Sequence, residues 1–119
     1  MAWTREEKQA YERAYYANNV RGRKDRTKAQ REARKDKFRA ALHEHLTSNP
    51  CVDCGESDIV VLEFDHLPGC EKLFDVGRAW DRKWDDVVKE ISKCEVVCCN
   101  CHRRRTTKRS NGWRMNLPL

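Results

Sequence analysis

With 119 residues, of which 39% are apolar and 37% charged, the chain can form one small domain, or a small domain with an arm, but no large core. No segment approaches the roughly 18 consecutive apolar residues of a membrane span, so we expect no membrane partner. The net charge of +6 is divided unevenly. Residues 1–47 hold 13 Lys/Arg and 7 Asp/Glu, residues 48–101 hold 6 and 12, and residues 102–119 hold 6 and none. Basic flanks around an acidic middle favour a polyanionic partner such as nucleic acid; the alternative is solvated helix faces.

The N-terminal part of the chain is predicted to be helical. Thr4 and Glu7 have the spacing of a capping box, and aromatic residues recur every four positions from there, which predicts a helix over residues 4–18. A segment with Asn and Gly then predicts a break. A second helix is predicted over residues 24–46, but only its end, from Phe38 onward, has an apolar face. We therefore expect a basic helical arm, a compact domain and a tail, at residues 1–47, 48–109 and 110–119.

The middle of the chain predicts strands and short helices. Residues 59–64 are rich in β-branched and large apolar side chains, which predicts a strand, and Pro68-Gly69 predicts the turn that follows it. A helix is predicted over about 81–93, a short strand over 94–97 and a last helix from about residue 100. In the first of these helices Trp80 and Trp84 recur at helical spacing, so we expect both in the core and not as a base-stacking platform.

Seven cysteines carry the clearest signal. Two Cys-x-x-Cys pairs, Cys51 with Cys54 and Cys98 with Cys101, have the spacing that closes a tetrahedral zinc site. Disulfides are the alternative, but the odd number of cysteines and the absence of an apolar leader favour a reducing compartment, the cytoplasm. We expect one structural zinc on these four cysteines, which compensates for the small core. The other cysteines are expected to be buried or free thiols: Cys70, Cys94 and Cys99.

Asp65-His66 lies between the two pairs, and the second pair runs directly into His102 and an Arg-Arg-Arg-Thr sequence. A strand with Asp-His, a second strand and a helix that opens with Cys-x-x-Cys-His resemble the HNH endonuclease family, in its zinc-bearing branch common among bacterial viruses. The resemblance covers residues 51–107 and implies an α+β fold, with a ββα-metal core stapled by the four-cysteine site. The chain departs from the family at the middle Asn, which braces the loop around the catalytic histidine. The corresponding position, near Lys93-Cys94, holds no Asn.

The resemblance implies metal-dependent hydrolysis of DNA phosphodiester bonds, by nicking or by double-strand cleavage. His66 is then the general base, because an imidazole can take a proton from water near neutral pH. Asp65 and His102 would hold one catalytic divalent ion, which could be magnesium, manganese, nickel or zinc. Basic residues of the last helix are expected to contact DNA phosphates: Arg103, Arg104, Arg105, Lys108 and Arg109.

Other interpretations stay open. Asp65 and His66 could be an exposed turn pair, and His102 could replace a cysteine as a zinc ligand. The chain would then be a non-catalytic zinc-ribbon module that binds DNA, which the missing Asn favours and the Asp-His pair disfavours. A third possibility is an interaction protein whose N-terminal helices dock a partner. The likeness to virus-encoded proteins suggests genome packaging in the host cytoplasm, with a phage terminase or another packaging protein as partner, by analogy alone. His43 and His45 are expected on the surface.

Overall fold

The computed structural model of the protein describes residues 2–15, 17 and 27–117. Its helices and strands are, in chain order, α1 (Arg5–Tyr15), α2 (Lys28–Thr47), β1 (Leu62–His66), α3 (Trp84–Ile91), β2 (Cys94–Cys98) and α4 (Cys99–Arg109). Short 3-10 helices lie at Ile59–Val61, Val76–Arg78 and Trp113–Asn116. The fold is therefore α+β, as predicted. Within the described ranges, none of the helices has the length and apolar character needed to traverse a bilayer.

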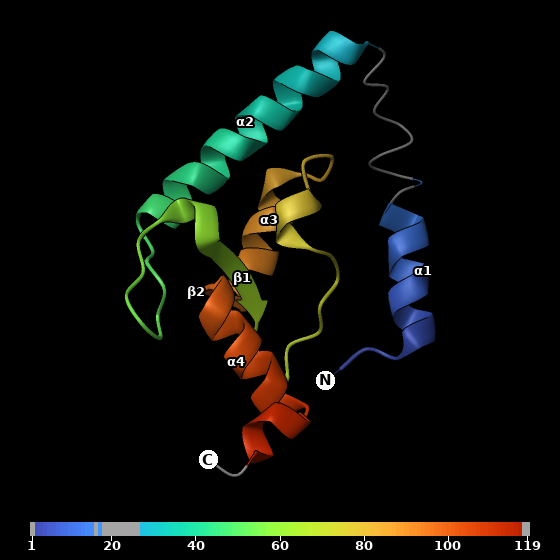
Figure 1. The fold of residues 1–119 in the computed structure, drawn as a ribbon. Coiled ribbons are helices and arrows are strands. Elements are labelled where there is room, and N and C mark those ends of the chain that lie inside the picture. The colour runs from blue at the N-terminus through green and yellow to red at the C-terminus, as the bar shows by residue number, and fades with distance from the viewer. Residues whose placement is uncertain (1, 16, 18–26, 118–119) are drawn as a thin grey trace.

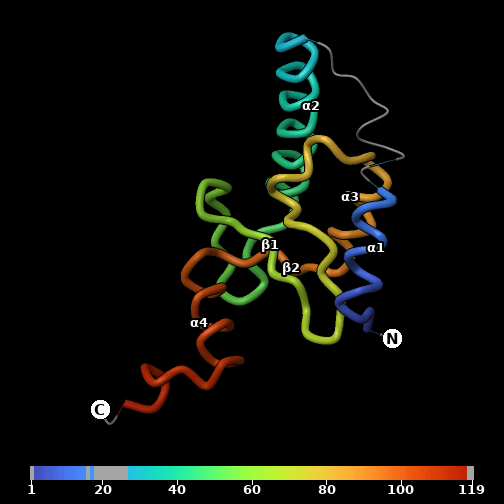
Figure 2. Tube along the Cα trace, turned by 90° about the vertical axis from the view of Figure 1, so that its right-hand side faces the viewer, coloured from blue at the N-terminus to red at the C-terminus, as the bar shows by residue number. Residues whose placement is uncertain are grey.

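β1 and β2 form a two-stranded antiparallel sheet at the centre of the fold, called the hairpin below although α3 lies in the segment that connects its strands. α4 follows β2 without a loop. The strands are in register from the pair Leu62–Cys98 to the pair His66–Cys94. Figure 1 and Figure 2 show α4 on one side of this hairpin and α3 on the other. Side chains on the two faces of β1 therefore meet different helices.

The strand predicted over residues 59–64 exists, but it is shifted toward the C-terminus. The side chain of Asp58 accepts a hydrogen bond from the backbone N–H of Val60 (3.0 Å) and caps a 3-10 turn where extended chain was expected. β1 then continues through Asp65 and His66, which both pair with β2. Successive side chains of a strand point to opposite faces, so this extension determines where the two candidate residues lie.

Two small apolar clusters hold the fold together. The first surrounds the cysteine pairs and contains Leu62, Val96 and Val97, with Leu46 of α2 packed against it. The second cluster joins α2 to the region of α3; its buried members are Phe38, Val76, Ala79 and Val87. The predicted apolar end of α2 therefore belongs to the core, and only the earlier part of this helix projects as an arm (Figure 1).

Helix α1 packs against the segment that precedes α3. The hydroxyl of buried Tyr15 accepts a hydrogen bond from the backbone N–H of Lys83 (3.0 Å), and Glu12 forms a 2.7 Å ion pair with Arg82. The capping box of Thr4 and Glu7 is present. The predicted break between the two N-terminal helices lies outside the described residues.

The two tryptophans expected in the core have different environments. Trp80 is half-buried and packs against the second cluster, as predicted. Trp84 is 43% exposed, so that prediction is wrong for this residue. The reason is the direction of α3: its first residue, Trp84, and Val88 one turn later lie on its outward face, while Val87 points into the core.

Candidate functional site

The four predicted zinc ligands lie together. The sulfur atoms of Cys51, Cys54, Cys98 and Cys101 are all within 4.8 Å of one another. The Cys54 and Cys98 sulfurs are 3.7 Å apart, and a tetrahedral zinc with Zn–S bonds of ~2.3 Å has sulfur–sulfur edges of about 3.8 Å. Among the described residues no other group of His, Cys, Asp or Glu forms such a cluster. The four cysteines therefore form a site that can bind a structural zinc.

Local backbone geometry explains why the cysteines converge. In the first pair the N–H of Gly55 donates to the carbonyl of Cys51 (2.8 Å), and Gly55 has φ +81°, a left-handed conformation that glycine adopts at little cost. The N–H of Val52 donates to the carbonyl of Val96 (3.0 Å) and ties this turn to β2. The second pair opens α4, where the Cys98 sulfur accepts the N–H of Cys101 (3.4 Å).

The pKa values of two of the four thiols are relevant to binding of a cation. Burial raises the pKa of Cys51, but backbone hydrogen bonds at Cys98 and Cys54 outweigh it and lower the pKa to about 6. Burial and the neighbouring sulfurs raise the pKa of Cys101 to about 12. The cluster thus accommodates one thiolate readily, and further thiolates need a positive charge among them.

Asp65 is 2% exposed and faces α4, where arginines hold its carboxylate. Arg109 donates to both oxygens (2.7 and 2.8 Å), and Arg105 donates to Oδ2 (2.9 Å). Burial raises the pKa of Asp65, but these two arginines outweigh it and keep the pKa below its ordinary value. Arg105 also donates to Asp53 (2.7 Å) and Glu95 (3.0 Å), so it links the first cysteine turn to both strands.

His102 is the second candidate ligand on this face, and it points at Asp65. Its Nε2 is 3.5 Å from Oδ1 of Asp65, while its Nδ1 is 2.6 Å from the carboxylate of Glu63. A carboxylate accepts hydrogen bonds, so the Nδ1–H donates to Glu63 and Nε2 faces Asp65. A nitrogen lone pair beside a carboxylate is repulsive unless a proton or a metal ion lies between them. Ligand atoms bound at ~2.1 Å around a tetrahedral ion are about 3.4 Å apart, so the 3.5 Å separation matches two ligands of one ion, and it also matches the ion pair that the two groups form when the imidazole is protonated.

His66 lies on the opposite face of β1, toward α3. Its Nε2 is 2.8 Å from the carboxylate of Glu90, a residue only 1% exposed. Glu90 also accepts hydrogen bonds from the N–H of Leu73 (2.9 Å) and the ammonium group of Lys93 (2.8 Å). Burial raises the pKa of Glu90, but these donors lower it below the ordinary value. Because the carboxylate accepts this hydrogen bond, Nε2 of His66 carries a proton, and in the neutral tautomer the lone pair is on Nδ1.

Of the three predicted catalytic residues, the structure brings only two together. Asp65 and His102 face each other, whereas His66 is turned to the other side of the hairpin. This follows from the strand running through both positions, since adjacent residues of a strand alternate.

Lys93 braces the loop that follows His66. The carbonyl of Lys93 accepts the N–H of Leu67 (2.9 Å), and its ammonium group donates to the carbonyl of Glu71 (3.0 Å). Together with the bond from Leu73 to Glu90, these contacts fix the loop after His66 at three points.

The basic residues of α4 form two groups. Arg105 and Arg109 are engaged by carboxylates, and Arg104 donates to the Cys101 sulfur (3.6 Å). Arg103 and Lys108 are exposed and make no ion pair within the described part of the chain, so they are accessible to phosphates.

Glu63 and Glu90 are the site residues that sequence reasoning missed. Glu63 could have been found from its spacing, because it lies two residues before Asp65 on the same face of a strand. Glu90 had no such signal, since its contact with His66 is set by how α3 packs.

Comparisons of the chain with protein-family models, with curated proteins and with solved structures find no match, so the family resemblance rests on the motif residues alone.

Proposed function

We propose that the protein is a metal-dependent endonuclease of the HNH type that hydrolyses DNA. The observation that carries this proposal is the placement of Asp65 and His102, 3.5 Å apart across β1 and α4, with Glu63 on the far nitrogen of the imidazole. A histidine that binds a metal through one ring nitrogen usually donates the N–H of its other nitrogen to a carboxylate, which fixes the orientation of the ring. Glu63 has this position relative to His102. The divalent ion held there would neutralise charge at the phosphate and at the departing 3′ oxygen.

His66 is the general base in this proposal. With its proton on Nε2, held by Glu90, its Nδ1 can accept a proton from an attacking water. His66 is the last residue of β1, so its side chain must meet the substrate at the end of the strand, beside the loop braced by Lys93. Water attack at phosphorus with departure of the 3′ oxygen leaves 5′-phosphate and 3′-hydroxyl ends.

In this proposal Arg109 binds Asp65 in the free protein and a DNA phosphate in the complex. It donates to the Asp65 oxygen that faces His102, so an ion held by Asp65 and His102 would take its place at that oxygen. A displaced guanidinium next to the ion would be placed to contact a DNA phosphate. The four-cysteine zinc acts only as a staple, because it joins the turn before β1 to the start of α4.

A non-catalytic zinc-ribbon module that binds DNA is the second candidate, and one observation favours it. Asp65 already accepts three hydrogen bonds from arginines, so its burial is explained without a catalytic ion. In that case His66 and Glu90 are a structural pair that supports α3.

A supercoiled-plasmid assay distinguishes the two candidates. Zinc-loaded protein is incubated with magnesium, manganese, nickel or added zinc, and relaxed and linear forms are quantified beside a His66→Ala control. The nuclease proposal expects cleavage with at least one metal and its loss in the control. Retardation of the DNA without cleavage under all four conditions supports the binding module instead.

A further inference from the structure

A half-open cavity of about 560 Å³ lies between α2 and the start of α3, on the opposite side of the hairpin from α4. Its volume is within the range of pockets that hold small ligands. None of the candidate nuclease or zinc residues contributes to it. Its walls are formed by Arg34, Lys37, Phe38, Ala41, Trp80, Arg82, Lys83, Trp84 and Asp85.

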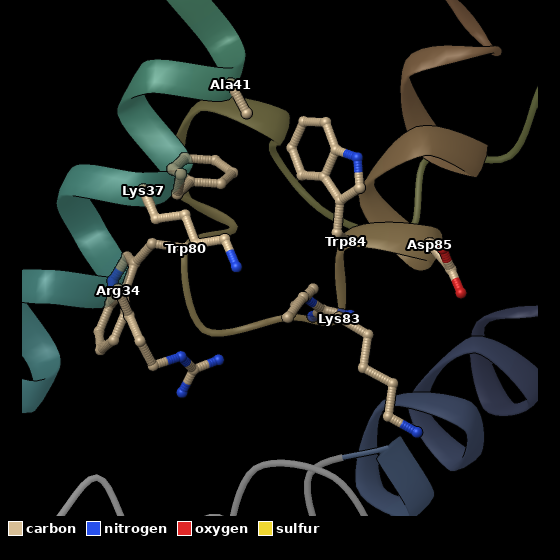
Figure 3. Close-up of a pocket in the computed structure, with 9 residues that line it drawn as sticks. Arg34, Lys37, Ala41, Trp80, Lys83, Trp84 and Asp85 are labelled. Atoms are coloured by element: carbon tan, nitrogen blue, oxygen red, sulfur yellow. The ribbon is translucent and has the colours of Figure 1, made fainter.

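The indole ring of Trp84 lines this cavity. Figure 3 shows its indole standing between α2 and α3, opposite Ala41 and the end of the Lys37 side chain. It is 43% exposed, and in the part of the chain that is described it has no aromatic or cationic partner on its ring. Trp80 differs, because the cationic groups of Lys35 and Arg34 lie 5.0 and 5.8 Å from its ring centroid.

Cationic side chains also line the cavity. In Figure 3 the end of Lys37 lies near the indole, whereas Lys83, directly before Trp84, extends away from it toward α1. Within the described ranges Lys37 and Lys83 form no salt bridge, so their charges are not neutralised by the protein. The single acid of the wall, Asp85, points away from the cavity in Figure 3.

We propose that this cavity binds an unpaired nucleotide of single-stranded DNA, with the base stacked on Trp84 and the adjacent phosphates on Lys37 and Lys83. A flat π surface with unneutralised cations around it is the combination by which proteins hold single strands without reading sequence. A base paired in a duplex has both faces covered by its neighbours, so the site selects unpaired bases. This site is separate from the proposed cleavage site and does not depend on cleavage.

The first test measures binding of a fluorescently labelled ten-residue oligothymidylate to the zinc-loaded full chain, by anisotropy and without added divalent metal. Trp84→Ala should weaken binding about 5- to 150-fold, the range expected for loss of one stacked base. Trp84→Phe, which keeps a ring, should bind within a few-fold of the wild type. Trp113→Ala removes a tryptophan that is 68% exposed outside the cavity, and it should leave affinity unchanged. Circular dichroism and zinc content identify variants that fail to fold.

The second test examines the phosphate contacts and compares a single strand with a duplex and with a free nucleotide. Lys37→Gln with Lys83→Gln should weaken oligothymidylate binding and lower its salt dependence, whereas Lys89→Gln, on the same helix as Trp84 but outside the cavity, should not. Duplex binding should be insensitive to Trp84→Ala.

The proposal is overturned if Trp84→Ala and Trp84→Phe both bind the oligonucleotide as tightly as the wild type. It is also overturned if free thymidine monophosphate or an acidic peptide binds as tightly as the strand with the same dependence on Trp84. Since no step requires cleavage, an inactive nuclease with Trp84-dependent binding would refute the proposed function and keep this one.

Discussion

The two candidate functions differ most clearly at Asp65, because arginines hold its carboxylate and the nuclease proposal assigns a divalent ion to it as well. Arg109 and Arg105 satisfy it in the present structure, and His102 faces it with the nitrogen that a metal ion would use. The pKa of Asp65 is below its ordinary value, so the group is ionised at neutral pH and is ready for either partner. Which partner it takes decides between an enzyme and a binding module.

Arg109→Gln should therefore strengthen binding of a divalent ion at Asp65. The substitution removes a positive charge from the same carboxylate, and we expect roughly a 10-fold tighter dissociation constant for manganese or nickel. Isothermal titration of zinc-loaded protein measures it. Arg103→Gln removes an exposed charge from the same helix and should leave the affinity within a few-fold of the wild type; equal effects of the two variants would contradict the competition.

Glu90→Gln should destabilise the fold in a pH-dependent way. An amide cannot accept all the hydrogen bonds that the buried carboxylate accepts, and we expect a loss of about 2–3 kcal/mol near pH 7. The pKa of Glu90 is lowered from 4.5, so its ionised form contributes stability above that pH, and the contribution is lost as the pH falls through the lower folded-state value.

The measurement is the difference in unfolding free energy between wild type and Glu90→Gln from pH 7 to pH 3. The difference should shrink below about pH 5, because the wild type becomes protonated too. Zinc release at low pH affects both proteins and cancels in the difference. A difference that grows between pH 5 and pH 3 would contradict this assignment.

At the scale of elements, the sequence predicts the hairpin and the last helix because local signals agree there. Cys-x-x-Cys spacing, β-branched runs and the helical start after Cys98 all favour one arrangement, and the cysteine cluster confirms it. The side-chain directions could not be predicted to the same degree. Strand alternation predicts opposite faces for Asp65 and His66, so a common site required the strand to end about there, but β1 continues through both residues. Trp84 is a similar case, since its exposure depends on how α3 rotates against α2.

The cysteine staple gives the element-scale prediction. Cys54→Ala should lose zinc and melt the hairpin and α4 cooperatively, because a structural zinc contributes folding free energy directly. Cys54 is exposed, so the substitution removes little packing. Cys99→Ala, which is also exposed but lies outside the cluster, is the matched control and should keep zinc and melting temperature. A zinc-free Cys54→Ala protein with unchanged melting temperature would refute the staple.

Over the whole molecule, the hairpin separates two basic surfaces with different chemistry. On the side of α4, exposed Arg103 and Lys108 lie beside arginines that are bound by carboxylates. On the side of α2 and α3, Lys37 and Lys83 line the same cavity as the exposed indole of Trp84. The uneven charge seen in the sequence therefore becomes two surfaces on a folded domain, and the acidic middle supplies the carboxylates that hold Arg105 and Arg109.

Arg103→Gln with Lys108→Gln should weaken duplex DNA binding and reduce the slope of log affinity against log salt by up to about 1.8, the value for two phosphate contacts. Arg78→Gln with Lys89→Gln changes the net charge equally on the side of α3, and it should change the slope less. Fluorescence anisotropy across a salt series gives both slopes. Identical slopes for the two variants would mean that α4 is not the duplex-binding surface.

The most direct measurement of the nuclease proposal is the dependence of plasmid cleavage on metal concentration for wild type, His66→Ala and His102→Ala, all with one zinc bound. His66→Ala should cleave about 100- to 10,000-fold more slowly at every metal concentration, since it lacks the base and keeps the metal ligands. His102→Ala should need a higher metal concentration and recover part of its rate there, since it lacks a ligand. If His66→Ala cleaves at the wild-type rate, or if zinc-loaded wild type fails to cleave with any of the four metals, the protein is not the nuclease proposed here.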